Sequence, residues 1–253
     1  MPQLFRRRSC TGCEACSSAC PNGSIGMVEA CAGLHLYPRI DRDSCVECGI
    51  CTRVCPSECF TREAKNPEAT LDGDDPVFAG DCYAAASKDP MVLQTSSSGG
   101  AFTALANHVI AQHGSVYGCA WTGDMMPQHM RVNELSELWR LRGSKYVQSR
   151  IGDTFSRVRT DLDAGKEVLF VGTPCQVAGL RSYLRKDSKN LLTVDLVCHG
   201  VPSARFFADY LGVAFGDVEG IEDVVFRDKT QGWGCGGGPC TSEVLAESTE
   251  PRW

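Results

Sequence analysis

The chain has 253 residues, of which 43% are hydrophobic and 22% are charged, which is ordinary for one large globular domain or two smaller ones. A net charge of -6 without a sustained Lys/Arg face argues against a nucleic-acid partner. No stretch approaches the roughly 18 consecutive apolar residues of a membrane span. Sixteen cysteines are the unusual feature. The N-terminal MPQLFRRRSCTG shows no secretory signal, so we expect a cytoplasmic protein whose cysteines are thiolates in a reducing compartment.

Eight of these cysteines form two copies of one run, CTGCEACSSACP and CVECGICTRVCP. In each copy three cysteines are separated by two residues, and a fourth follows after three more and is joined to proline. Three thiolates at this spacing wrap a loop around one [4Fe-4S] cluster, and the fourth ligates the other cluster. We therefore predict one cluster on Cys10, Cys13, Cys16 and Cys55, and a second on Cys45, Cys48, Cys51 and Cys20.

Zinc is the alternative metal for such a cysteine pattern. It favours two separated C-x₂-C pairs that close one tetrahedron, and a third cysteine at the next two-residue gap has no use in that scheme. The run resembles bacterial two-cluster ferredoxins over residues 8–60. That resemblance implies an α+β ferredoxin-like module, which we place at residues 1–62. Cys31 and Cys59 lie outside the pattern, and we expect them to be packing residues.

A polar stretch around residues 66–89 favours a linker, placed at 63–92, with at most one short helix. Helix and strand patterns then alternate, which predicts an α/β domain with a mainly parallel sheet over residues 93–230. The expected helices cover 99–112, 134–142, 153–165, 174–186 and 203–215, and the expected strands cover 115–121, 167–172, 191–198 and 221–226.

One strand-to-helix corner, VLFVGTPCQVAGL, has the residues of a capped helix start. Thr173 stands at the N-cap, Pro174 at the first helical position and Gln176 where a capping box needs it. Cys175 therefore falls in the first turn, where the helix dipole favours a thiolate. The alternative is a small residue packed beneath the turn.

Three further features mark candidate ligand sites. LVCHGVPS places Cys198 and His199 at the carboxyl end of a strand, the rim where parallel sheets bind ligands, although a satisfied turn histidine is the simpler interpretation of His199. Cys119 lies within a strand and is expected to pack in the core. TSSSGGAF exposes N–H groups at a helix start, which suits a phosphate, and RGSKY adds a lysine for an anionic cofactor tail.

Four segments, SSSGGAFTALANHVIAQHGSVYGCAW, LRGSKYVQS, VLFVGTPCQVAGLRSYL and LVCHGVPS, occur in this order behind the two cysteine runs. Together they resemble the beta-subunit family of coenzyme F(420) hydrogenase/dehydrogenase, from residue 8 to about residue 230. The resemblance implies an iron–sulfur flavoprotein with FAD. It implies catalytic roles for Cys175 and Cys198, which would also help to hold a further cluster. The implied flavin-binding residues are Ser97, Ser98, Gly99, Gly100, Thr103, Gly143, Ser144, Lys145, Tyr146, Gly172, Thr173 and Pro174.

The sequence departs from the family pattern after FRDKTQGW, where it continues as GCGGGPCTSEVLAESTEPRW. This ending has no periodicity. We expect residues 231–253 to be an irregular tail of a truncated C-terminal part, and we assign no role to Cys235 and Cys240.

The functional interpretation is an oxidoreductase. Electrons would pass between a redox partner protein, two [4Fe-4S] clusters and a flavin that exchanges hydride with a small-molecule substrate. The alternative is a ferredoxin-type electron carrier or adaptor that binds no flavin. No Ser-His-Asp arrangement, carboxylate pair or phosphate-transfer motif stands out in the sequence to favour another enzyme class.

Overall fold

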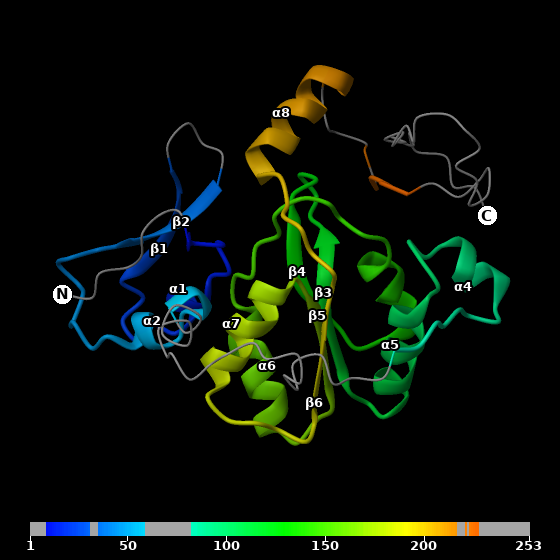
Figure 1. The fold of residues 1–253 in the computed structure, drawn as a ribbon, viewed down its shortest axis with the longest axis horizontal. Helices are drawn as coiled ribbons and strands as arrows, with labels where there is room; N and C mark the ends of the chain where they lie inside the picture. The colour runs from blue at the N-terminus through cyan, green and yellow to red at the C-terminus, as the bar shows by residue number, and fades with distance from the viewer. Residues whose placement is uncertain (1–8, 31–34, 59–81, 217–220, 222, 228–253) are drawn as a thin grey trace, which may run out of the picture.

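The computed structural model describes residues 9–30, 35–58, 82–216, 221 and 223–227. They form a mixed α/β structure with a mainly parallel four-stranded sheet and a separate two-stranded antiparallel sheet (Figure 1). The expectations for the tail at 231–253, for most of the linker and for four cysteines lie outside the described residues. Those cysteines are Cys31, Cys59, Cys235 and Cys240.

The N-terminal part is built from two similar halves. Strand β1 (Ile25–Ala30) pairs antiparallel with β2 (His35–Ile40). The short helices α1 (Ala15–Ser18) and α2 (Ile50–Arg53) carry the third cysteine of each run. Each helix starts after a residue in the left-handed conformation, Glu14 in the first run and Gly49 in the second. The repeated spacing thus produces a repeated turn.

The large sheet has the strand order β4-β3-β5-β6. Strands β3 (Ser115–Trp121), β5 (Val168–Gly172) and β6 (Leu191–Asp195) run parallel, and β4 (Pro127–Val132) is antiparallel to β3. The central strand β5 reads VLFVG and is almost entirely buried, as a strand covered on both faces must be. The expected mainly parallel sheet is therefore confirmed.

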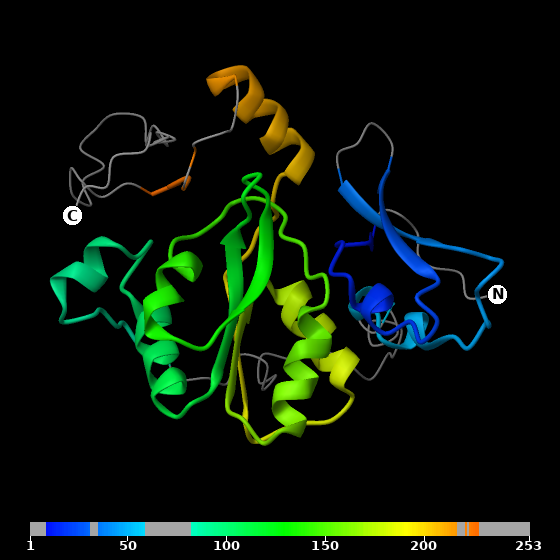
Figure 2. The same cartoon turned by 180° about the vertical axis from the view of Figure 1, so that it is seen from behind.

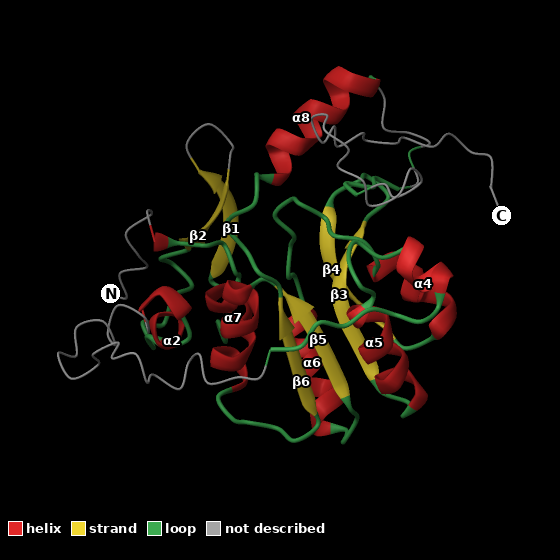
Figure 3. Ribbon diagram, turned by 45° about the vertical axis from the view of Figure 1, so that its right-hand side comes forward, coloured by secondary structure: helices red, strands yellow, loops and turns green. Residues whose placement is uncertain are grey.

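Helices cover both faces of this sheet, as Figure 2 shows from behind and Figure 3 in a turned view. On one face α6 (Thr154–Asp163) and α7 (Pro174–Leu184) lie between the sheet and the N-terminal part, around Phe155, Phe170 and Leu180. The other face carries α5 (Ala101–Ala111), the 3₁₀ helix η3 (Leu135–Leu141) and, farther out, α4 (Pro90–Gln94). Helix α8 (Ala204–Phe215) projects beyond the end of the sheet (Figure 1). None of the helices in the described ranges is long and apolar enough to cross a membrane.

Three elements differ from the sequence-based expectations. The expected strand at 221–226 is wrong, because the described residues there form no strand, and their apolar side chains pack instead on Trp121 and Phe207. The expected helix at 134–142 is a 3₁₀ helix. Strand β4 was not expected; only alternate parts of PQHMRV are buried, so the segment lacks the continuous apolar run of its neighbours.

A buried carboxylate ties α6 to the large sheet. Asp161 is 5% exposed and accepts a 2.6 Å hydrogen bond from the Tyr117 hydroxyl. Its oxygens also lie 3.0 Å from Arg131 Nε and 3.3 Å from Lys166 Nζ. Burial alone would raise the pKa of Asp161, but these hydrogen bonds and cations outweigh it and hold that pKa below its ordinary value. The ionised form is therefore the one that stabilises the fold.

Replacing Asp161 by asparagine is expected to lower the free energy of unfolding at pH 7 by about 3 kcal/mol, because the neighbouring cations lose their partner. The pKa of Asp161 is depressed in the folded state, so this contribution is complete above the carboxyl's unfolded pKa and is lost as the pH falls through the folded value. Urea unfolding at pH 7 and at pH 3 checks both points. The matched control is Asp163→Asn, at an exposed pair with Lys186, which should change stability by less than about 1 kcal/mol. Equal losses for the two variants would contradict the assignment.

Candidate functional site

Four cysteines from the two runs meet in one small cavity. It is lined by Cys10, Cys13 and Cys16 of the first run and by Cys55 of the second. Burial, followed by the nearby Cys175 and Cys55, raises the pKa of Cys13 to about 12, and burial likewise raises the pKa of Cys10, Cys16 and Cys55. These thiols therefore keep their protons in the absence of a metal, and a metal that binds them must displace those protons.

The other four cysteines meet in a second small cavity. It is lined by Cys45, Cys48 and Cys51 of the second run and by Cys20 of the first, with Ile25 and Ile40 of the antiparallel pair as its apolar wall. This cavity lies nearer the surface, since Cys48 is exposed and the neighbouring Val46 is 62% exposed. The two cavities thus have the same cysteine pattern but different access to solvent.

The distribution of these thiols fits a pair of cubane clusters. Each set takes three cysteines from one run and the fourth from the other, as two-cluster ferredoxin sites require. Within the described ranges, no group of three or more His, Cys, Asp or Glu side chains is gathered so as to hold a metal ion directly. A cubane spreads its ligands over several iron atoms, so its cysteines do not adopt the close tetrahedral spacing of a zinc site.

A third cavity, of about 380 Å³, lies at the carboxyl end of the parallel strands. We call it the large cavity. Its volume falls within the roughly 300–1,000 Å³ of typical cofactor pockets. Ten of the fourteen residues to which the resemblance assigns a flavin-binding or catalytic role line it, although they come from three separate segments. They are Ser97, Ser98, Gly99, Gly100, Gly143, Ser144, Lys145, Gly172, Thr173 and Cys175.

One wall of the large cavity is the start of α5. Gly100, with φ of 84°, turns the chain into the helix, and a side chain at Gly99 would collide with the Ala85 carbonyl oxygen. Ser97 Oγ accepts a 2.7 Å hydrogen bond from the Ser144 amide, which joins this wall to the RGSKY segment. Lys145 Nζ donates to the carbonyls of Arg140 at 3.0 Å and Arg142 at 2.6 Å. Backbone N–H groups and cations therefore border the same side of the cavity.

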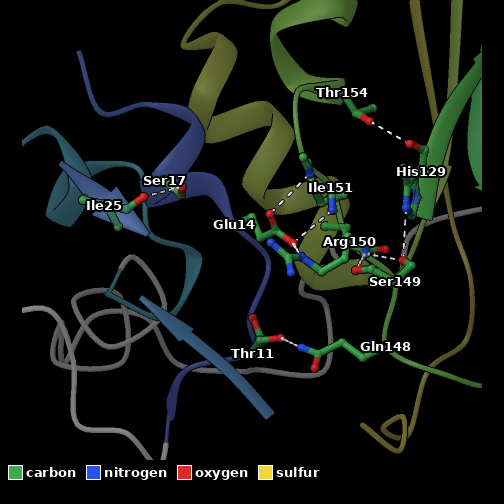
Figure 4. Close-up of polar contacts among 12 residues, drawn as sticks. Thr11, Glu14, Ser17, Ile25, His129, Gln148, Ser149, Arg150, Ile151 and Thr154 are labelled. Carbon is green, nitrogen blue, oxygen red and sulfur yellow. Dashed lines mark hydrogen bonds and ion pairs between the residues drawn. The ribbon is translucent and has the colours of Figure 1, made fainter. Parts of the chain in front are cut away.

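The opposite wall contains a chain of buried hydrogen bonds (Figure 4). Gln176 Nε2 donates to Ser149 Oγ at 2.9 Å, and that hydroxyl lies 3.1 Å from His129 Nδ1. His129 Nε2 lies 3.1 Å from the Val171 carbonyl oxygen, which can only accept, so Nε2 carries the proton. Burial lowers the pKa of His129 to about 4 and keeps the ring neutral at neutral pH.

Cys175 lies where the large cavity meets the first cysteine set. The expected capped helix start is found, because Gln176 Oε1 accepts a 3.0 Å hydrogen bond from the Thr173 amide. Cys175 Sγ lies 3.2 Å from Thr173 Oγ1, and the thiol is close enough to Cys10 and Cys13 to influence both electrostatically. Cys13 itself lines both the first cysteine cavity and the large cavity.

The other four residues to which the resemblance assigns a flavin-binding or catalytic role do not line the large cavity. Thr103 is buried within α5, and its hydroxyl has no hydrogen-bond partner among the described residues. Tyr146 stands edge-on to Phe226 at a ring-centroid distance of 5.4 Å. Pro174 begins α7. Cys198 is exposed, and its sulfur accepts from the Gly200 amide at 3.5 Å.

The comparisons with known proteins agree with both halves of this arrangement. Residues 9–59 match the 4Fe-4S dicluster domain, and residues 165–234 match the family described as the C terminus of the coenzyme F420 hydrogenase/dehydrogenase beta subunit. Residues 165–234 of this chain are thus similar to this beta-subunit family. The second match covers β5, α7, β6 and α8, and so contains Gly172, Thr173, Pro174, Cys175 and Cys198.

Beyond these two family matches, the search of curated proteins finds no match. Among solved structures, the chain is similar to a chain of the F420-reducing [NiFe] hydrogenase complex from Methanosarcina barkeri, with 19% identity and a TM-score of 0.43. The similarity covers 58% of this chain and 55% of that one, so the chain spans about half the length of that hydrogenase chain.

Several residues of the large cavity were missed by sequence reasoning. His129 lies on the unexpected strand β4, and Gln148 and Ser149 end the LRGSKYVQS segment but were given no role. Cys119 was expected to pack in the core, but it is half-buried and lines the large cavity, where burial raises its pKa to about 11. The VQS that follows RGSKY is the sequence signal that could have indicated Gln148 and Ser149.

The crossed ligand sets can be tested through iron content. Cys13→Ala is expected to lower the iron of the reconstituted protein by about half, because one of two clusters loses a ligand. Cys55→Ala should lose the same half, and the double variant no more than either single change. If each run instead held its own cluster, the double variant would lose nearly all its iron. Cys82→Ser, at an exposed cysteine outside both cavities, is the control and should leave iron unchanged.

Proposed function

We propose that this chain is an iron–sulfur flavoprotein oxidoreductase. In it, electrons pass between a partner protein, two [4Fe-4S] clusters and FAD in the large cavity, and a small molecule exchanges hydride there. The observation that carries the proposal is the double position of Cys13, which lines the cavity of the first cysteine set and the large cavity at once. A group in the large cavity would therefore lie against a ligand of the first cluster.

The exposure of the two cysteine sets supports an order for the electron path. Cys48 of the second set and the neighbouring Val46 are exposed, whereas Cys13 of the first set is buried in the core cluster that it shares with the α/β domain. A partner protein can therefore approach the second set more closely than the first. The second cluster is thus the contact for the partner, and the first cluster is the contact for the large cavity.

The large cavity suits an anionic cofactor with a flat apolar ring. Its α5 side offers N–H groups at a helix start together with Lys145 and Arg142, and these would hold phosphates. The Nε atom of Arg142 is buried and has no hydrogen-bond partner among the described residues, which leaves it available to a ligand. A bound flavin would supply the conversion between one-electron transfer and hydride transfer.

The opposite wall would determine which hydrogen-bond donors and acceptors face this cofactor. His129 is neutral, because its Nε2 proton is committed to the Val171 carbonyl and its Nδ1 accepts from Ser149. Gln176 holds Ser149 in turn and is itself fixed by the helix start at Thr173. The wall therefore presents a preset pattern of donors and acceptors with no net charge. The charge of the cofactor would then be balanced by the cations on the other side of the cavity.

Flavin content separates this proposal from a carrier or adaptor that binds none. Acid extraction of the anaerobically purified protein should release flavin, measured by fluorescence. Arg142→Met, which keeps the aliphatic stem and removes the charge, should weaken flavin retention about tenfold while iron stays unchanged. Arg157→Met on the exposed side of α6 is the control and should retain flavin. A fully iron-loaded protein without flavin would favour the adaptor.

The role proposed for Cys175 has its own test. Cys175→Ser should slow reduction of the bound flavin, since the thiol lies between the first cysteine set and the large cavity, and should leave the iron content intact. Stopped-flow absorbance after mixing with dithionite measures the reduction, and iron analysis measures the clusters. Unchanged kinetics would mean that Cys175 is only a packing residue.

A further inference from the structure

The two cysteine loops share a backbone conformation but differ in where they carry glutamate. Each loop has a left-handed residue on either side of its second cysteine: Gly12 and Glu14 in the first loop, and Glu47 and Gly49 in the second. Glycine adopts this conformation without steric cost, and glutamate does not. The loops therefore exchange the positions of glycine and glutamate. Gly49 has the same place in the second loop as Glu14 has in the first, so glycine is compatible with the turn at this position.

Glu14 has a set of contacts that explains its place in a conformation that glycine would adopt more easily. Its side chain is 4% exposed, and Oε1 accepts from Arg150 Nε at 2.9 Å and from the Ile151 amide at 3.1 Å. Oε2 accepts from the Gly152 amide at 3.3 Å (Figure 4). All three donors belong to the α/β domain, so this carboxylate joins the first cysteine loop to that domain. Glu47 in the second loop is exposed.

The segment that Glu14 holds continues directly into the wall of the large cavity. Gln148 and Ser149, immediately before Arg150, line that cavity. Gln148 Nε2 donates to the Thr11 carbonyl at 3.4 Å, and a side chain at Gly12 would collide with the same amide nitrogen. The loop and the wall therefore touch at two points, on either side of Cys13. Because of these contacts, a shift of the first cysteine loop also moves the cavity wall.

We infer that Glu14 is a positioning residue, which sets the distance between the first cluster and the group bound in the large cavity. The identity of the electron acceptor rests on the proposed function. The docking of the first cysteine loop on the cavity wall rests on the geometry alone. In the step concerned, the reduced cluster loses one electron and the acceptor in the large cavity gains it, with dithionite as the external reductant. Glu14 takes no part in that exchange. It holds the two groups at a fixed separation.

The loops themselves supply matched variants of the full-length chain. Glu14→Gly installs the residue that the second loop has at this position, so the turn is kept and the three hydrogen bonds are lost. Glu14→Gln keeps Oε1 as an acceptor for Arg150 and Ile151 and replaces the oxygen that faces Gly152. Glu47→Gly makes the same chemical change at the exposed left-handed position of the second loop. All three should bind wild-type amounts of iron after anaerobic reconstitution.

Hydrogen–deuterium exchange measured by mass spectrometry reports the docking without any cofactor activity. In Glu14→Gly, the peptide containing Ile151 and Gly152 should exchange about fivefold faster or more, because its amides lose their acceptor. Glu14→Gln should restore most of that protection, and Glu47→Gly should match the wild type. Unchanged exchange in Glu14→Gly would overturn the inference.

The rate of flavin reduction by dithionite, compared at equal iron content, reports the positioning. It should fall about tenfold or more in Glu14→Gly, recover largely in Glu14→Gln and stay unchanged in Glu47→Gly. A wild-type rate in Glu14→Gly, with exchange increased, would refute the positioning role. If the wild-type protein binds no flavin, the proposed function fails, and the exchange measurement still decides whether Glu14 docks the loop.

Discussion

The close approach of the first cysteine loop to helix α7 determines how the first cysteine set and the large cavity lie relative to each other. Gly179 lies at the contact, and a side chain built there would reach 3.3 Å from Ala15 and 3.4 Å from the sulfur of Cys13. Cys13 and Ala15 belong to the same buried cluster as Phe155 and Leu180 of the α/β domain. The iron–sulfur part is therefore packed into the core of its neighbour, and the distance from the first cysteine set to the large cavity follows from side-chain packing.

The internal repeat gives two nearly equivalent loops very different surroundings. The first loop is buried against α7 and the wall of the large cavity, and the second is open to solvent at Val46 and Cys48. Burial disfavours the charged forms of a site, and exposure screens them, so the two sites are electrostatically distinct even though their ligands are alike. The asymmetry arises from the neighbouring domain, since the cysteine spacing is the same in both runs.

The features predictable from sequence were those that local chemistry determines. Cysteine spacing indicated how the eight thiols divide between two cavities, and helix caps indicated the start of α7. The large cavity was only partly predictable, because His129, Ser149 and Gln148 are brought to it by tertiary packing and their residue types alone indicate no ligand. The strand expected at 221–226 failed for a similar reason. Its apolar residues pack on Trp121 and Phe207, and an apolar run does not specify whether it pairs with a strand or covers a side-chain cluster.

The large cavity is complete only when both parts of the chain are in place. Its walls include Thr11, Gly12 and Cys13 from the iron–sulfur part as well as the ends of β5 and β6. A ligand held there would contact both parts, and its binding free energy would favour their docked arrangement over any separated one. Conversely, proper folding of the first cysteine loop would be a condition for ligand binding. Cluster assembly and occupancy of the large cavity are then linked equilibria, because one loop of the backbone takes part in both.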